Sequence, residues 1–326
     1  MKQANKSIFE YSKDIDKKLP SVINTILGLK VIGLERIEQG VMNYVFKVET
    51  EGGLVLARVF GKKDAADMRN LLWINKRLAD NQIKHPKILG YSLTDEFFPF
   101  GLMISEFITG KEGVKAINEK EVSLSDYFHR LGVLVKKIHS IPVDEYGGVG
   151  DGSNGRSNFS EHTIPKVDSL ITECVDAGNL TAELSDKIRI IVKEVLLKYE
   201  NRFGPVLVHG DCGPTNQILS EEGDLFMIDW DYARRGVWLE DLVPIILSAG
   251  QFSETEQVEE VTLEIRKSFL KGYGVTEYSE KEIIEIERVF IAIAYLYNLS
   301  FYSSDSRNLD AATHAKEKLN ELMNDA

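Results

Sequence analysis

The hydrophobic pattern of the chain changes near residue 110, and this change limits the folds that it can adopt. Before it, short runs rich in branched and aromatic residues predict β-strands. Five such runs lie at residues 30–37, 44–50, 54–60, 87–92 and 100–108. Glu51-Gly52-Gly53 is typical of a hairpin, because glycine reaches positive φ at low cost. Apolar residues at helical spacing predict one helix over residues 65–81 and short helices before Leu29.

After residue 110 the pattern is mainly helical. Residues 125–140 and 185–199 each show one apolar helix face, and Ser253 with Glu256 and Ser279 with Glu282 form candidate capping boxes. Residues 145–158 hold too many glycines for a regular element and predict a loop. Only residues 205–231 return to a strand pattern, as two short strands joined by a turn. We therefore expect an α+β fold with a β-rich domain at 1–110 and a helical domain at 111–326.

The charge distribution excludes some classes of partner. The chain has 39 Lys and Arg against 51 Asp and Glu, a net charge of −12, which disfavours a general grip on nucleic acid or anionic lipid. Residues 1–110 carry 16 against 13, and residues 111–326 carry 23 against 38. The acidic second part would suit a cationic ligand, although acidic surfaces are also common on soluble helices.

The cysteine content and the N-terminus indicate the compartment. Two cysteines, Cys174 and Cys212, cannot form a disulfide framework and favour a reducing cytoplasm. The first 20 residues lack an apolar signal core, and no run approaches the roughly 18 apolar residues of a membrane span. We expect a cytoplasmic monomer or weak dimer without a nucleic-acid or membrane partner.

The candidate catalytic and metal-binding residues lie at the ends of the two strands within 205–231. His209, Gly210 and Asp211 end the first strand, Asn216 follows, and Asp229 ends the second strand. A hairpin between them is expected to bring Asp211, Asn216 and Asp229 to one sheet edge. Two carboxylates and an amide oxygen suit Mg²⁺ that also keeps waters and substrate phosphates. A carboxylate free of the metal can align a hydroxyl nucleophile and accept its proton.

These residues resemble the signature of the aminoglycoside phosphotransferase and choline kinase superfamily, which is related to protein kinases. The signature is HGDxxxxN followed by a strand ending in IDW or IDF, here 209–216 and 228–231. The resemblance extends over the whole chain and implies a two-lobed kinase-like fold. Further matching segments are Gln39-Gly40-Val41-Met42-Asn43, Arg58, Glu106-Phe107-Ile108-Thr109-Gly110, Ile138-His139 and Gly236 to Asp241.

The resemblance implies a role for each matching residue. Asp211 would be the catalytic base or the carboxylate that orients the hydroxyl, and Asn216 and Asp229 would hold Mg²⁺ against the phosphates of ATP or GTP. Arg58 would reach the α and β phosphates, and His209 would brace the loop. The residues expected around the nucleotide are Gln39, Gly40 and Asn43 of the phosphate loop and Ser105, Glu106, Phe107 and Ile108 of the linker.

The chain departs from the family pattern at three places. Arg58 replaces the usual lysine, and arginine binds phosphate through a planar fork. The helix at 65–81 has no glutamate to pair with it, so Asp67 or Asp64 is the nearest acidic candidate. The phosphate loop has only one glycine, Gly40.

Several interpretations stay open from the sequence. The favoured acceptor is a small cationic, aminoglycoside-like molecule with a hydroxyl group, whether for antibiotic resistance or metabolism. Choline, homoserine, methylthioribose or a ketosamine would fit the same motifs, as would a nucleotide-binding pseudokinase or a metal-dependent phosphohydrolase. Individual side chains also have structural interpretations: Asp231 as a supporting acid, Cys212 as a small packed residue, and Trp230 and Trp238 as core or pocket-wall residues.

Overall fold

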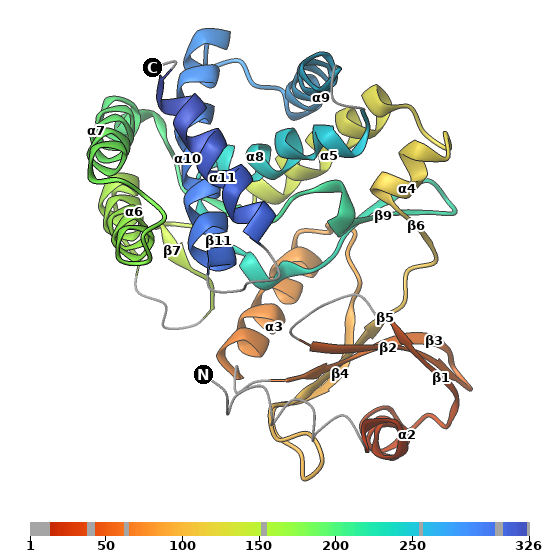
Figure 1. Ribbon diagram of the computed structural model, residues 1–326. Coiled ribbons are helices and arrows are strands. Elements are labelled where there is room, and N and C mark those ends of the chain that lie inside the picture. Colours follow the sequence, from red (N-terminus) through yellow and green to blue (C-terminus); the bar gives the residue numbers. More distant parts are fainter. Residues whose placement is uncertain are drawn as a thin grey trace. The chain divides into compact units, whose positions relative to one another are not determined.

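A five-stranded antiparallel sheet forms from the first part of the chain, in the order β1-β2-β3-β5-β4 (Figure 1). This computed structural model describes residues 14–37, 43–61, 65–150, 155–253, 257–303 and 309–324. The strands are β1 (Val31–Ile37), β2 (Asn43–Thr50), β3 (Gly53–Phe60), β4 (Ile88–Ser92) and β5 (Leu102–Glu106), with helices α2 (Ile15–Leu27) and α3 (Ala65–Asp80). The predicted sheet with one inserted helix is therefore confirmed.

Helix α2 packs on one face of this sheet. Its Leu19 and Ile23 are fully buried in a cluster with alternate residues of the strands, among them Ala57 and Val59 of β3. Side chains of a strand alternate between the two faces, so Arg58, between Ala57 and Val59, belongs to the opposite face. Its neighbours across the sheet are Val45 on β2 and Met103 on β5, which places the cation in the centre of the sheet.

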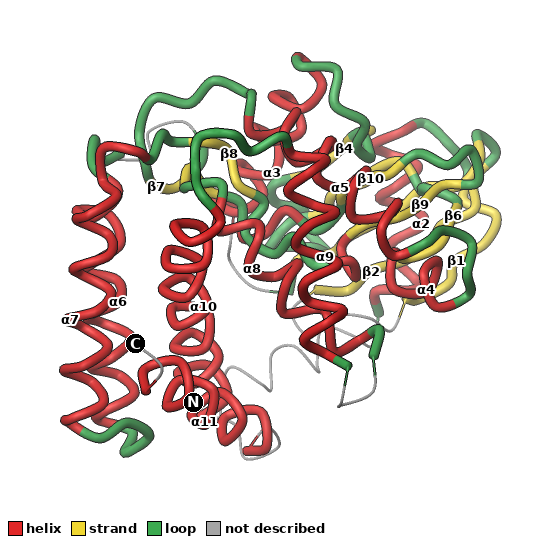
Figure 2. The backbone as a smooth tube through the Cα atoms, turned by 90° about the horizontal axis from the view of Figure 1, so that it is seen from above, coloured by secondary structure: helices red, strands yellow, loops and turns green. Residues whose placement is uncertain are grey.

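The remainder of the described chain is mainly helical. Its helices are α4 (Gly113–Asn118), α5 (Leu124–His139), α6 (Phe159–Asp176), α7 (Ala182–Tyr199), α8 (Leu239–Leu247), α9 (Val258–Tyr273), α10 (Glu280–Ser303) and α11 (Leu309–Asn324). Helices α6 and α7 run side by side next to α10, while α5 pairs with α9 (Figure 2). That pair approaches closely at two glycines. A Cβ atom on Gly132 would lie 2.3 Å from the Phe269 carbonyl oxygen, and one on Gly272 would lie 2.0 Å from that of His129.

Two small sheets carry the polar motifs. One is β7 (Gly147–Gly148), β11 (Arg234–Gly236) and β8 (Val206–Val208), and the other is β10 (Leu225–Met227), β9 (Gln217–Ser220) and β6 (Gly110–Glu112). All pairings are antiparallel where the register is defined. Strand β8 precedes His209, and the β9–β10 hairpin lies between Asn216 and Asp229.

Contacts divide the chain into two compact units. The first unit comprises Met1–Lys111 and Gln217–Asp231, and the second comprises Glu112–Asn216 and Tyr232–Ala326. The hairpin at 217–231, which sequence analysis placed within residues 111–326, thus belongs by its contacts with the β-rich unit. Lys84 of the first unit forms an ion pair with Asp224 at the tip of the hairpin.

Some elements differ from those expected. Helix α6 was not predicted, because Pro165 and several polar residues interrupt its apolar pattern. The capping box of Ser279 is confirmed, since its amide donates to the Glu282 carboxylate at 2.8 Å and the Glu282 amide donates to its hydroxyl at 3.4 Å. The box of Ser253 and Glu256 and the helix expected before residue 14 lie outside the described residues.

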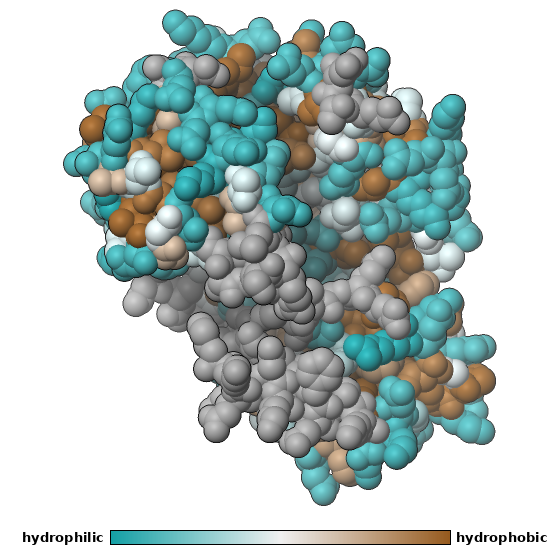
Figure 3. Space-filling model, viewed as in Figure 1, coloured by the Kyte–Doolittle hydropathy of each residue, from teal (hydrophilic) through white to brown (hydrophobic). Residues whose placement is uncertain are grey.

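The surface seen in Figure 3 is largely hydrophilic, with apolar side chains in separate patches. Large apolar side chains exposed on α6 and α7 include Val175, Ile190 and Leu197. Among the helices that the structure describes, each is too short or too polar to cross a bilayer.

Candidate active site

A sharp turn after β8 presents Asp211. Gly210 has φ +84°, and a Cβ atom there would lie 2.3 Å from both the Arg234 Nη1 and the Tyr232 carbonyl oxygen. Only glycine fits this left-handed and crowded position. His209 is fully buried, and its Nδ1 accepts a hydrogen bond from the Asp211 amide at 3.3 Å. As expected, His209 braces the loop while Asp211 is half-buried at its end.

Asp241 on α8 stabilises this turn through hydrogen bonds to its backbone. Its carboxylate accepts hydrogen bonds from the His209 amide at 2.9 Å and the Gly210 amide at 2.7 Å. His139, at the end of α5, lies 3.0 Å away through Nε2. Burial raises the pKa of the Asp241 carboxyl, but the hydrogen bond and charge of His139, the nearby His209 and the Gly210 amide outweigh it and lower that pKa. Asp241 is therefore an ionised, fully enclosed acceptor.

His139 joins Asp241 to Tyr273 through its two ring nitrogens. An ionised Asp241 only accepts, so Nε2 of His139 carries the proton and donates to it. The other ring nitrogen, Nδ1, lies within hydrogen-bond distance of the Tyr273 hydroxyl, at 2.9 Å. Tyr273, His139, Asp241 and the turn at Gly210 thus form one buried chain of hydrogen bonds.

Asp211 and Asn216 are joined directly. The Asn216 side-chain amide donates to the Asp211 backbone oxygen at 2.9 Å and to the Asp211 Oδ2 at 2.8 Å. A 3₁₀ turn at Pro214–Asn216 makes this approach possible. Because both bonds use the NH₂ group, the orientation of the amide is fixed and its oxygen points away from Asp211. That oxygen is a hard ligand of the kind that Mg²⁺ prefers, so Asn216 fits the predicted role.

Asp229 follows the hairpin in an unusual backbone conformation. Met227 pairs with Gln217, so the chain enters the hairpin from Asn216 and leaves it towards Asp229 at the same open end. Asp229 has φ +59°, which is uncommon for a residue with a side chain and is typical of functional turns. Its carboxylate is 53% exposed and therefore accessible to a ligand.

Arg58 contacts the two carboxylates that follow the hairpin. One Nη lies 2.9 Å from Asp231 Oδ1 and the other contacts Asp231 Oδ2, which is a bidentate pair. The first also lies 3.6 Å from Asp229 Oδ1. From the sequence, Asp67 or Asp64 was the nearest acidic candidate for this cation, and the carboxylates described in contact with it, Asp229 and Asp231, follow the hairpin. The Asp64 backbone and the Asp67 side chain lie outside the described residues, so that prediction is not tested.

The predicted linker residues occupy the end of β5 and the segment after it. Ser105 is buried, and the Glu106 carboxylate accepts a hydrogen bond from the Lys87 amide at 3.0 Å, which ties the linker to β4. Lys47 stacks over the Phe107 ring at 5.3 Å. Ile108 is half-buried in the segment that leads to Gly110.

The predicted phosphate loop is described only at its end. Asn43 begins β2 opposite Phe60, and its Oδ1 accepts a hydrogen bond from the Gly61 amide at 3.4 Å. Gln39 and Gly40 lie outside the described residues, and their roles stay predictions.

Cys212 and Trp230 have structural roles. Burial raises the pKa of the Cys212 thiol well above its usual value, so the thiol is neutral and serves as a small packed residue. Trp230 is buried, and its indole nitrogen donates to the Met227 oxygen at 3.2 Å.

Within the residues that the structure describes, no three His, Cys, Asp or Glu side chains form a metal cluster.

The sequence indicated the residues of the loop but not the contacts of Asp231 and Asp241, which hold the site in place. Asp231 was interpreted as a supporting acid without a partner, and Asp241 only as a match to the family pattern. The available signal was their position: Asp231 ends the second strand, and Asp241 lies in the first turn of α8. Pairing with Arg58 and His139 depends on tertiary contacts 173 and 102 residues apart in the chain.

Comparison with protein families gives one match. A model described as "Phosphotransferase enzyme family" matches residues 33–280, which include every candidate site residue named above. No curated protein matches the sequence.

Solved structures show the same fold at low sequence identity. The aminoglycoside phosphotransferase APH(4)-Ia is 16% identical, with a TM-score of 0.70 over 96% of this chain and 98% of that chain. The GDP and kanamycin complex of APH(2")-IIia is 15% identical, with a TM-score of 0.68 over 95% and 99%. A putative fructosamine-3-kinase from Haemophilus somnus 129PT is 14% identical, with a TM-score of 0.65 over 96% and 99%. At these identities the likeness concerns the fold.

Proposed function

Because this chain belongs to the phosphotransferase enzyme family, we propose that it transfers the γ-phosphoryl group of ATP or GTP to a hydroxyl of a small molecule. The observation that carries this proposal is the fixed pair of Asp211 and Asn216, joined at 2.8 Å. One side chain is a carboxylate at the end of a rigid turn, and the other presents an oriented amide oxygen. A base beside a hard ligand is what phosphoryl transfer to a hydroxyl requires.

In the proposed mechanism, Asp211 binds the acceptor hydroxyl and takes its proton as the oxygen attacks the γ-phosphorus. The bond from the γ-phosphorus to the β,γ-bridging oxygen breaks, and the nucleoside diphosphate leaves. Asn216 and Asp229 would hold Mg²⁺, which when bound neutralises charge on the phosphate oxygens. Arg58 would reach the phosphates with its guanidinium, which Asp231 orients. Positioning accounts for most of the rate in such a transfer, so no covalent enzyme intermediate is needed.

We propose a small cationic, aminoglycoside-like acceptor. The support is the acidic balance of residues 111–326, with 23 basic against 38 acidic side chains, and the similar structures of complexes with kanamycin or hygromycin B. A metabolic acceptor is the second candidate, because a putative fructosamine-3-kinase has a similar structure.

Nucleotide consumption measured against a panel of acceptors tests the proposal. The panel contains kanamycin, hygromycin B, choline, homoserine, methylthioribose and a fructosamine, each with ATP and with GTP. Turnover that depends on one acceptor supports a kinase and identifies its acceptor class. Nucleotide hydrolysis that no acceptor stimulates would favour a phosphohydrolase, and nucleotide binding without turnover would favour a pseudokinase.

Nucleotide binding is expected to depend on Mg²⁺. At about 100 times Kd, a nucleotide stabilises a folded protein by about 2.7 kcal/mol, which corresponds to a rise in Tm of roughly 5 °C for a chain of this size. We expect this rise with ATP and Mg²⁺ and a much smaller one with ATP and EDTA. Asp229→Asn should reduce the effect of the metal, because a carboxylate ligand is lost. A shift of equal size with and without Mg²⁺ in the unaltered protein would contradict the metal site.

Asp231→Asn should weaken nucleotide binding through Arg58. The pair is bidentate and Arg58 is only 13% exposed, so loss of the carboxylate frees the guanidinium to leave its position. We expect KM for the nucleotide to rise about fivefold, with a smaller change in kcat. The control is Asp224→Asn, which removes the exposed pair with Lys84 on the same hairpin. Equal KM values in both variants would show that Asp231 does not position Arg58.

A further inference from the structure

A single nitrogen of Arg58 contacts both carboxylates that follow the β9–β10 hairpin. Its Nη1 lies 2.9 Å from Asp231 Oδ1 and 3.6 Å from Asp229 Oδ1, while its Nη2 contacts Asp231 Oδ2. The three residues belong to the same compact unit. Asp229 is the proposed carboxylate ligand of the metal, so a protein cation lies next to the oxygen that would bind it.

The position of this cation is fixed by its surroundings. The Arg58 side chain is only 13% exposed, and its Cζ lies 5.1 Å from the ring centroid of Phe60, which is buried. The bidentate pair with Asp231 restricts the rotation of the planar guanidinium. By contrast, the Asp229 carboxylate is 53% exposed. The guanidinium is therefore held beside Asp229, while the carboxylate itself is open to solvent.

The charges of this group disfavour a divalent cation that arrives alone. Two carboxylates and one guanidinium leave a single net negative charge. A divalent cation on Asp229 would also be repelled by Arg58, and this repulsion at a few Å is stronger near a protein surface than in bulk water. Mg²⁺ gives up its hydration water reluctantly, so it binds weakly where the ligands carry too little negative charge.

A nucleotide changes this balance of charge. Its phosphates bring several negative oxygens, and Arg58 is the residue proposed to reach them. A guanidinium that turns towards a phosphate moves away from Asp229 and leaves that carboxylate to the metal. By linkage, each of the two ligands then raises the affinity for the other by the same factor.

We propose that Arg58 is a built-in counter-ion that keeps free divalent cations off Asp229 until a nucleoside triphosphate draws the guanidinium away. The inference rests on the metal role of Asp229 in the proposed function and adds an order of binding. The metal enters together with the nucleotide or after it. The same side chain that recognises the phosphates thus excludes the metal in their absence.

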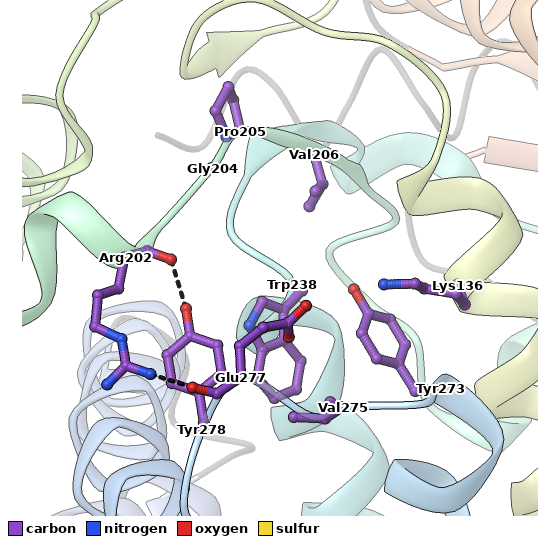
Figure 4. Close-up of a pocket in the computed structure, with 10 residues that line it drawn as sticks. All are labelled: Lys136, Arg202, Gly204, Pro205, Val206, Trp238, Tyr273, Val275, Glu277 and Tyr278. Carbon is purple, nitrogen blue, oxygen red and sulfur yellow. Dashed lines mark hydrogen bonds between the residues drawn. The ribbon is translucent and has the colours of Figure 1, made fainter.

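Mn²⁺ is a suitable probe, because it prefers the same oxygen ligands as Mg²⁺ and few other sites compete for it. Within the part of the chain that the structure describes, no three His, Cys, Asp or Glu side chains form a cluster. The pocket of about 440 Å³ at the start of β8 is also unsuited to a divalent cation (Figure 4). Glu277 is the one carboxylate among its lining residues, which include Lys136 and Arg202.

Titration of the nucleotide-free protein with Mn²⁺, followed by the electron paramagnetic resonance signal of the free ion, tests the proposal. We expect Arg58→Gln to bind Mn²⁺ about tenfold more tightly than the unaltered protein, because the repelling cation is lost. Adding Asp229→Asn to this variant should remove the gain. The control is Lys84→Gln, which removes the exposed cation paired with Asp224 on the same hairpin and should leave the affinity for Mn²⁺ unchanged.

Arg58→Lys provides a second, milder variant in case Arg58→Gln does not fold. A lysine ammonium is a point charge that cannot pair with both Asp231 oxygens as the arginine fork does, so we expect a gain of about threefold. Unchanged Mn²⁺ affinity in the folded Arg58 variants would overturn the proposal, as would a gain that persists with Asp229→Asn. The titration measures metal binding alone, so a chain that transfers no phosphate would give the same result.

Nucleotide affinity gives a readout of opposite sign. Arg58→Gln should bind ATP with Mg²⁺ less tightly than the unaltered protein, because a phosphate contact is lost, while it binds free Mn²⁺ more tightly. A residue that only holds the fold together would weaken both. A fall in both affinities would therefore show that Arg58 does not act as a counter-ion.

Discussion

Asp211→Asn should lower kcat by about three orders of magnitude, because a general base contributes about 10²–10⁴-fold to such a reaction. The asparagine oxygen can still accept the hydrogen bond from Asn216, so the turn should keep its shape. Nucleotide affinity should change little, since Asp211 is not assigned to the nucleotide. The measurement is steady-state turnover of the acceptor identified in the panel, with kcat and the nucleotide KM determined separately.

A matched control separates loss of the base from general damage. Asp144→Asn removes an exposed carboxylate of the same unit that has no place in the site, and it should leave kcat unchanged. Turnover of Asp211→Asn within a few-fold of this control would mean that another group accepts the proton. The proposed mechanism would then be wrong even if the chain is a kinase.

Among the proposed variants, Asp241→Asn should cause the largest fall in the free energy of unfolding. Three donors surround the carboxylate, and an amide would leave at least one of them without an acceptor in a fully buried position. Breaking a buried ionic contact costs about 3–5 kcal/mol, which corresponds to a fall in Tm of roughly 10 °C at neutral pH. Thermal unfolding followed by circular dichroism measures this change. Asp168→Asn, which removes a 3.2 Å surface pair with Arg189, should change Tm by little.

The difference between Asp241→Asn and the unaltered protein should depend on pH in a defined direction. The folded pKa of Asp241 lies below its usual value, so the unfolded chain binds the proton more readily. The stabilisation is therefore complete above the unfolded pKa of about 3.9 and is lost as pH falls through the folded pKa. We expect the two unfolding curves to converge in acid. A constant difference down to strongly acidic pH would show that the charge of Asp241 does not contribute.

The sequence predicted the elements that local chemistry determines. Strand runs such as residues 54–60 and the helix at 65–81 follow from side-chain pattern and backbone preference, and the structure contains them. The motif around Asp211 and Asn216 was equally local, since five residues separate its members. Helix α6 was not predicted, because its proline and polar residues interrupt the apolar pattern of its sequence. Its buried face is evident only from its packing against the neighbouring helices.

The supports of the site could not be predicted in the same way. Whether Asp231 or an acid near α3 pairs with Arg58 depends on how the hairpin packs on the sheet. The spacing of apolar residues in the sequence does not indicate this packing. Similarly, nothing near Tyr273 in the sequence indicates that its hydroxyl meets His139, 134 residues away. The roles of Gln39 and Gly40 stay predictions, and the Asp229→Asn variant tests that of Asp229.

The position of Arg58 between two carboxylates has a consequence for anion selectivity. An isolated arginine would attract any small oxyanion, and orthophosphate and sulfate are abundant in solution. Here Asp231 and Asp229 already neutralise the guanidinium, so a lone oxyanion would have to displace or approach two negative charges. A triphosphate that arrives together with a divalent cation avoids this repulsion, since the cation offsets the charge of Asp229. The arrangement would thus discriminate against small inorganic competitors before the purine is recognised at all.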